Sequence, residues 1–111
     1  MAFVMNFPEI KPTVQKRTSK AFMDLAILRA LTKQAMTGYG INGFFNEKLG
    51  ITASPSMIYA SLSGLERKGW IRCVNNRSGR TYCLTDQGKE MVNLLPSISE
   101  EIQRFTRLLL G

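Results

Sequence analysis

A chain of 111 residues, of which 44% are hydrophobic, is long enough for one domain with a single core and too short for two. The sequence contains no histidine, which excludes a His-dependent catalytic triad and any zinc site that uses histidine. Its net charge of +7 favours a polyanionic partner.

The sequence has no segment typical of export or membrane insertion. No apolar run approaches the roughly 20 residues that a membrane span needs, and the first residues lack the basic start of a secretory signal. Two cysteines without such a signal are typical of an intracellular protein. We therefore expect an intracellular protein with no membrane partner. We also expect no metal site and no cofactor.

Basic residues concentrate in two segments. Residues 1–20 carry one acid, Glu9, and four bases, which are Lys11, Lys16, Arg17 and Lys20. Residues 70–85 carry three arginines and no acid. Because Pro8, Pro12 and scattered polar residues show no period, residues 1–18 are expected to form a flexible basic arm. The arm either contacts DNA phosphates or only adds solubility.

Two helices are expected next. Apolar residues recur at helical spacing from residue 19 or 20 to Ala35, which predicts the first helix. The second is expected from about Tyr39 to Leu49 and ends at Gly50. Gly40 and Gly43 lie on one side of the second helix, and we expect them to allow another backbone to approach closely.

The stretch SPSMIYASLSGLERKGW predicts a third helix, with Ser54 as its N-cap and Lys68–Gly69 as its end. One side contains Ile58, Ser61, Leu62 and Leu65, and the other Ser56, Tyr59, Ala60, Ser63 and Arg67. An ordinary solvent face would carry Lys and Glu. Small hydroxyl side chains instead let the backbone lie deep in a groove of DNA while they donate to phosphates and base edges. Tyr59 could also be a half-buried core tyrosine.

The segment WIRCVNNRSGRTYCLT predicts a β-hairpin. Asn76, Arg77 and Arg80 near its tip could form an ordinary solvated turn, but the excess of base favours phosphate contact. If the loop is residues 77–79, Cys73 and Cys83 lie opposite each other and could form a disulfide, whereas a register one residue different points them apart. Two small buried thiols are the favoured interpretation.

A last helix is expected over residues 86–111, capped by Asp86. Its apolar residues follow spacings of 4, 3, 4, 3 and 4, and they are Met91, Leu95, Ile98, Ile102, Phe105 and Leu109. This is a heptad seam, which favours dimerisation over a helix that only covers its own core. Pro96 should kink the helix or end it, and Ser97 with Glu100 resembles a capping box, which favours a restart.

Three helices, a hairpin and a further helix are the order of a winged helix-turn-helix. The expected fold is therefore mainly α with a small β-hairpin. It comprises the arm over residues 1–18, a winged helix-turn-helix DNA-binding domain over residues 19–85 and a dimerisation helix over residues 86–111. In this arrangement the third helix enters the major groove of DNA, and the hairpin is the wing.

Four sequence blocks resemble the PadR family of transcriptional regulators: GYGI at 38–41, SPSMIY at 54–59, LSGLERKGWI at 62–71 and TYCLTDQGKEM at 81–91. The resemblance implies a cytoplasmic, homodimeric DNA-binding repressor with the last helix as the dimer interface. It also implies a DNA-facing group of Ser54, Ser56, Met57, Tyr59 and Ser63, with Tyr39 near the DNA backbone. Family members that respond to ligands carry bulky aromatics at the dimer interface, whereas this last helix has only Phe105. The identity of any small-molecule effector therefore stays open.

The sequence thus predicts a sequence-specific regulator that binds double-stranded DNA, with no catalytic residues, because no nucleophile is placed beside a base and no Gly-rich phosphate loop occurs. The expected DNA contacts are Tyr39, Ser54, Ser56, Met57, Tyr59, Ser63, Asn76, Arg77, Arg80, Lys16, Arg17 and Lys20. Two alternatives are a winged-helix module that binds protein and an architectural DNA-binding protein without sequence preference.

Overall fold

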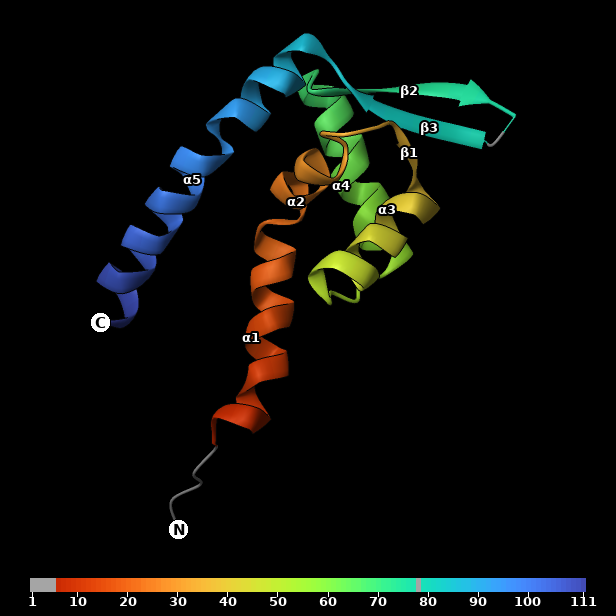
Figure 1. Cartoon of the computed structure of the whole chain (residues 1–111). Coiled ribbons are helices and arrows are strands. Elements are labelled where there is room, and N and C mark those ends of the chain that lie inside the picture. Colours follow the sequence, from red (N-terminus) through yellow and green to blue (C-terminus); the bar gives the residue numbers. More distant parts are fainter. Residues whose placement is uncertain (1–5, 78) are drawn as a thin grey trace.

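Helices dominate the computed structural model, which describes residues 6–77 and 79–111 (Figure 1). The elements in chain order are α1 (Phe7–Ala21), α2 (Met23–Ala30), β1 (Met36–Thr37), α3 (Gly38–Phe44), a π-helical turn η1 (Phe45–Leu49), α4 (Pro55–Lys68), β2 (Ile71–Asn76), β3 (Gly79–Leu84) and α5 (Asp86–Leu110). The expected fold, mainly α with a small β-hairpin in a winged-helix arrangement, is confirmed, and β1 adds a third strand to the hairpin.

The core lies between α2, α3, α4 and the inner face of the sheet. Its buried residues are Met23, Ile27, Leu28, Ala30, Leu31, Ile41, Phe45, Ala53, Ile58, Leu62, Leu65, Ile71 and Tyr82. All of them are apolar except for the Tyr82 hydroxyl. The buried residues of α4 are Ile58, Leu62 and Leu65. Their burial fixes the rotation of the helix about its axis, so its opposite side faces outward.

The flexible arm expected over residues 1–18 is wrong for residues 7–18, which form most of α1. Asn6 caps this helix by accepting a hydrogen bond from the Glu9 amide at 3.0 Å, and Pro8 lies in the first turn, where proline is tolerated. Pro12 lies inside the helix. No residue of α1 is buried. Residues 1–5 of the expected arm lie outside the described residues.

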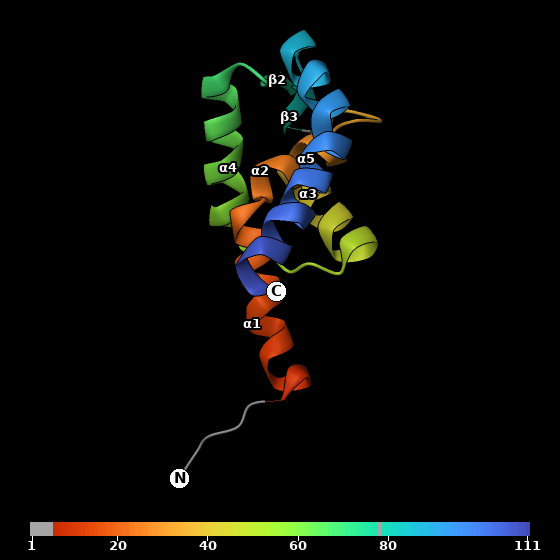
Figure 2. The same ribbon diagram turned by 90° about the vertical axis from the view of Figure 1, so that its left-hand side faces the viewer.

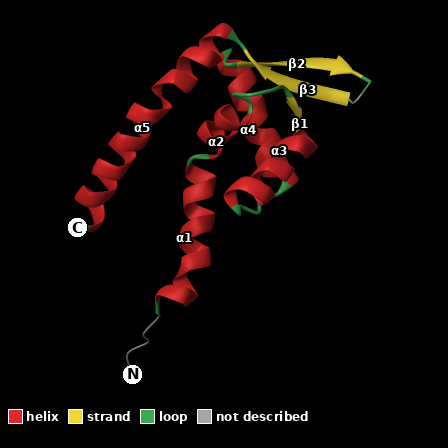
Figure 3. Ribbon diagram, in the orientation of Figure 1, coloured by secondary structure: helices red, strands yellow, loops and turns green. Residues whose placement is uncertain are grey.

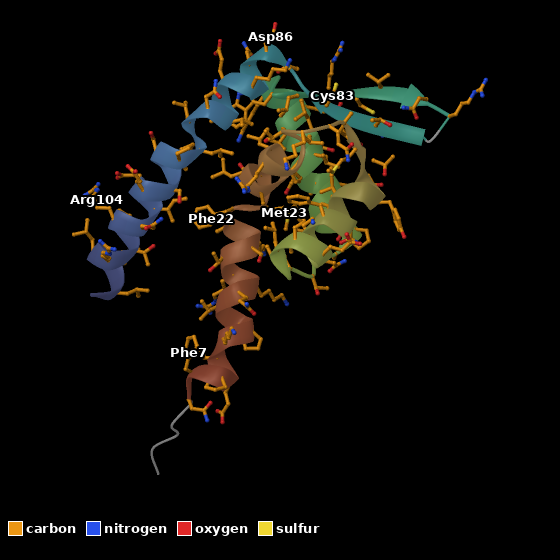
Figure 4. All side chains as sticks on the ribbon, in the orientation of Figure 1. Phe7, Phe22, Met23, Cys83, Asp86 and Arg104 are labelled. Atoms are coloured by element: carbon orange, nitrogen blue, oxygen red, sulfur yellow. The ribbon has the colours of Figure 1, made fainter. Side chains whose placement is uncertain are left out.

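The helix expected from residue 19 or 20 to Ala35 is wrong at both ends. The helical conformation is interrupted at Phe22, between α1 and α2, and α2 already ends at Ala30. Figure 4 shows Phe22 and Met23 at this break, between α1 and the core. Residues 31–34 form a turn and a bend, and Met36–Thr37 form β1, a strand that the sequence analysis did not predict (Figure 3). The second helix is confirmed as α3 with η1, which ends at Gly50 in the left-handed conformation with φ +62°.

The sheet has the order β1-β3-β2, with both pairs antiparallel. The hairpin is confirmed, and its register pairs Asn76 with Gly79 and Cys73 with Tyr82. Gly79 adopts φ +100°, which favours glycine at the turn. Because neighbouring residues of a strand point to opposite faces, Cys73 and Cys83 point apart, and both are free thiols.

The last helix is confirmed, but its N-cap is Thr85 and not Asp86. The Thr85 hydroxyl accepts a hydrogen bond from the Gly88 amide at 3.1 Å and donates one to the Gly69 carbonyl at 2.6 Å, which joins the end of α4 to the start of α5. The helix continues through Pro96, so the expected restart at Ser97 is wrong.

Close backbone approach occurs at a different glycine from those predicted. A Cβ on Gly88 would collide with the Trp70 carbonyl oxygen, whereas a Cβ on Gly43 would meet nothing within 4 Å and one on Gly40 would make ordinary contacts at 3.5 Å. The expectation for Gly40 and Gly43 is therefore wrong. The tight contact instead places the first turn of α5 against the base of the hairpin.

Figures 1 and 2 show that α1 and α5 both extend from the body on the side away from the sheet. The molecule is elongated as a result, with extents of 58 × 27 × 22 Å. The first part of α5 packs on α2 and β3, and the part beyond them projects outward.

Candidate nucleic-acid interface

The outer side of α4 is a hydroxyl-rich surface with little charge. Ser54, Ser56, Tyr59 and Ser63 are exposed and Met57 is half-buried, as the helical period predicts. Ser54 caps the helix by accepting a hydrogen bond from the Met57 amide at 3.2 Å. Its hydroxyl oxygen also lies 3.2 Å from that of Ser56, so the two serines form one polar pair at the start of α4.

Two tyrosines lie where α3 meets α4. Tyr39, in the first turn of α3, is 86% exposed. The ring of Tyr59 lies over Gly38, and its side chain is 48% exposed, so it is not a residue of the core. Thr37 caps α3 by accepting a hydrogen bond from the Gly40 amide at 3.0 Å.

The wing places its predicted polar residues on the surface. Asn76, Arg77 and Arg80 are all exposed, and the Asn76 side-chain amide donates a hydrogen bond to the Thr81 hydroxyl at 2.9 Å. Within the described residues, the Arg77 side chain makes no hydrogen bond and no ion pair. Its guanidinium is therefore available for a phosphate.

Arg80 has partners within the protein, which the sequence analysis did not predict. Its Nε donates a hydrogen bond to the Cys73 sulfur at 3.4 Å, and its guanidinium lies 5.9 Å from the centre of the Tyr82 ring. The hydrogen bond to Cys73 is the main cause that raises the pKa of Arg80. Burial raises the pKa of the Tyr82 hydroxyl, so both groups keep their protons at neutral pH.

The three predicted basic contacts on α1 are exposed, and one of them reaches α4. Lys20 lines a shallow polar groove with Asp24 of α2 and with Ser61, Gly64 and Lys68 of α4. Lys68 lies 3.8 Å from the Asp24 carboxylate and 4.8 Å from the centre of the Trp70 ring. Lys16 and Arg17 lie about one helical turn further from α4. The structure therefore brings Lys20 to the side of the third helix, and Lys16 and Arg17 only near it.

The predicted seam of α5 is covered at one end and open at the other. Met91, Leu95, Ile98 and Ile102 are half-buried, whereas Phe105 and Leu109 are 54% and 68% exposed. Arg104, which Figure 4 labels on the outer part of α5, pairs with Glu101 at 2.5 Å, and this contact raises its pKa. An apolar stripe that projects into solvent is typical of a helix that packs on another chain.

A second exposed apolar stripe lies on α1, and sequence reasoning missed it. Phe7, Ile10 and Val14 are 70%, 40% and 49% exposed. Their spacings of 3 and 4 residues were the available signal, but the two prolines argued against a helix.

Sequence reasoning also missed two contacts between distant residues, that of Gly38 with Tyr59 and that of Arg80 with Glu66. No short-range signal could have indicated either of them.

The described parts of the chain hold no group of three His, Cys, Asp or Glu residues that could bind a metal ion. Among the helices of those parts, none is long and apolar enough to cross a membrane.

Comparison with known families and structures identifies relatives of this fold. Residues 27–93 match the model of the "Transcriptional regulator PadR-like family". None of the curated proteins matches the chain. A PadR family transcription regulator from Clostridium difficile R20291 superposes with a TM-score of 0.67 at 24% identity, over 81% of this chain and 99% of that one.

Two structures of Bacillus subtilis PadR are also similar. The complex with operator DNA has 35% identity and a TM-score of 0.59, over 64% of this chain and 44% of that one. The complex with p-coumaric acid has 34% identity and a TM-score of 0.57, over 67% of this chain and 41% of that one. The present chain therefore matches less than half the length of that regulator.

Proposed function

Because the chain belongs to the PadR-like family of transcriptional regulators, we propose that it is a sequence-specific repressor that binds double-stranded DNA as a homodimer in the cytoplasm. The resemblance indicated by the four sequence blocks is thereby confirmed, and the family consists of regulators and not of enzymes. The observation that carries the proposal is the exposed serine face of α4 between two basic elements, the wing and the end of α1. In this proposal residues 19–85 bind DNA and residues 86–111 form the dimer.

Helix α4 enters the major groove in this proposal. Its small hydroxyl side chains allow close approach to the base edges, while the buried stripe of Ile58, Leu62 and Leu65 holds the helix on the body. The proposed contacts from α3 and α4 are Tyr39, Ser54, Ser56, Met57, Tyr59 and Ser63. The similarity to the Bacillus subtilis regulator in complex with operator DNA supports this assignment.

The flanking elements supply positive charge for phosphates, since the α4 face itself has little. Arg77 and Arg80, with Asn76, form the wing contacts, and Lys16, Arg17 and Lys20 form those of α1. Each cation that neutralises a phosphate releases condensed counterions, so these contacts make the affinity dependent on salt.

The dimer interface in this proposal is the α5 seam of Met91, Leu95, Ile98, Ile102, Phe105 and Leu109. The exposed apolar stripe of α1 supports dimerisation. An isolated helix of about 15 residues is only marginally stable in water, and α1 has no buried residue, so packing on a second chain would stabilise it. A symmetric pair of chains would cover both stripes and would place two α4 helices on one face of a duplex.

Regulation by a small molecule near the dimer interface is part of the proposal, since the Bacillus subtilis relative was solved with p-coumaric acid. The seam of α5 offers only one aromatic side chain, Phe105, for stacking on a phenolic ring. We therefore do not expect p-coumaric acid itself to be the effector.

The dependence of binding on salt and competitor tests the proposal. The dissociation constant for a labelled duplex should rise steeply between 50 and 200 mM salt, roughly 10³-fold if about six phosphates are contacted. A preferred site should outcompete bulk DNA by at least about 10³-fold. A module that binds protein would give no such salt dependence, and an architectural protein would give the salt dependence without the preference.

A further inference from the structure

Tyr59 of α4 lies directly over Gly38, the first residue of α3. A Cβ added to Gly38 would come 2.5 Å from the Tyr59 hydroxyl oxygen, 2.7 Å from Cζ and 3.0 Å from Cε1. Non-bonded atoms favour separations of about 3.5–4 Å, so no larger residue fits while the ring keeps this position. The ring therefore occupies the space that only a glycine leaves free.

Backbone conformation does not explain this glycine. The glycines with positive φ are Gly50, Gly69, Gly79 and Gly111, and Gly38 is not among them. Alanine is also the better helix former. What glycine provides at position 38 is room for the Tyr59 ring.

The Tyr59 ring packs against Gly38, whereas its hydroxyl makes no hydrogen bond in the part of the chain that the structure describes. The side chain is about half exposed. A donor that is already oriented loses little freedom when it binds a ligand. The geometry therefore suits a hydrogen bond to a group from another molecule.

The position of the hydroxyl indicates which group that is. Ser56 and Ser63 occupy the middle of the outer face of α4, whereas Tyr59 lies at the side where α4 meets α3. In a helix-turn-helix the helix before the recognition helix crosses the sugar-phosphate backbone. A hydroxyl at this junction is therefore closer to the expected path of the sugar-phosphate backbone than Ser56 and Ser63 are.

We propose that Gly38 is a positioning residue for DNA binding, which holds the Tyr59 ring so that its hydroxyl donates a hydrogen bond to a phosphodiester oxygen of the duplex. This inference rests on the proposed DNA-binding function. It adds to that function a residue that does not itself touch DNA and the type of contact that Tyr59 makes.

The test uses Gly38→Ala, Tyr59→Phe and the double variant, with Gly43→Ala as the matched control in the same helix. Binding to a selected site and to an unrelated duplex is measured at fixed salt. Gly38→Ala and Tyr59→Phe should each weaken binding to both duplexes by about tenfold, and the double variant should bind no worse than either. Gly43→Ala should bind like the wild type, because its Cβ meets nothing within 4 Å.

Three results would overturn the inference. The first is wild-type affinity of Gly38→Ala for both duplexes. The second is an affinity loss of about a hundredfold in the double variant, which would make the two effects independent. The third is an affinity loss confined to the selected site, which would indicate a base contact.

Folding is measured separately by denaturant titration. If Gly38→Ala does not fold, Gly38→Ala/Tyr59→Ala should fold, since the smaller side chain removes the collision; failure of that variant as well would contradict the contact. If the wild-type protein binds no duplex, the proposed function is overturned, and the phosphate contact with it. The folding measurements would still test the contact between Gly38 and Tyr59.

Discussion

The guanidinium of Arg80, in β3 near the tip of the wing, lies 4.0 Å from the carboxylate of Glu66, in the last part of α4. Arg80 and Glu66 have 64% and 34% exposed side chains, so water screens the pair and its contribution to stability is small. A phosphate can therefore compete with Glu66 for Arg80. The pair connects the two elements that we expect to bind DNA.

Glu66→Gln tests this competition. Removing the carboxylate frees Arg80 and takes a negative charge away from the interface, so we expect DNA binding to tighten about two- to fivefold at low salt. Fluorescence anisotropy with a labelled duplex measures the change. In an Arg80→Ala background the gain should largely disappear, and an equal gain there would show that Glu66 acts without Arg80.

Arg77→Ala and Arg80→Ala test the wing. Each should weaken binding to every duplex and reduce the slope of log K against log salt by about 0.9, the value for one phosphate contact. Arg104→Ala is the control, because Arg104 pairs with Glu101 on α5, far from the wing. If the slope is unchanged in the wing variants, the wing does not contact phosphates.

Ile102→Asp and Phe105→Asp test the dimer seam. A charge buried between two helices is strongly destabilising, so we expect monomers with at least about tenfold weaker binding to the preferred site. Analytical ultracentrifugation measures the oligomeric state. Gln103→Asp adds the same charge to an exposed position of α5 beside the seam and should leave the protein dimeric. A dimer that persists in the seam variants would place the interface elsewhere.

Gly88→Ala tests the contact that seats α5. Its Cβ would collide with the Trp70 carbonyl oxygen, so we expect the free energy of unfolding to fall by about 1–3 kcal/mol. Urea titration followed by circular dichroism gives this value. Gly64→Ala is the comparison, because its Cβ would meet only the flexible end of Arg67 at 3.8 Å, and it should be neutral or stabilising. Equal stability of the two variants would contradict the contact.

Much of the recognition helix and the hairpin could be predicted, because their signals are local. Ser54 and Pro55 mark the start of α4, the apolar period sets its inner face, and Gly69 ends it with φ +77°. The heptad spacing of α5 is likewise a property of the sequence alone. These elements agree with the structure because each depends on residues within a few positions of one another.

The errors and omissions have three physical causes. Pro8 and Pro12 argued against a helix that nevertheless forms behind the Asn6 cap, and β1 has only two residues, too few for a strand pattern. Contacts between distant residues, such as Tyr59 on Gly38 and Arg80 on Glu66, depend on the packing of α4 against α3 and the sheet. The hairpin register determines whether Cys73 and Cys83 lie opposite each other, and either register was compatible with the sequence.

Selection of bound duplexes from random DNA, with the number of chains per duplex measured on the selected site, tests the central claim most directly. The account predicts an inverted repeat whose half-sites are about 10 base pairs apart, or a multiple of that, and two chains on each site. A pool without an enriched sequence, or a single half-site bound by one chain, would contradict it.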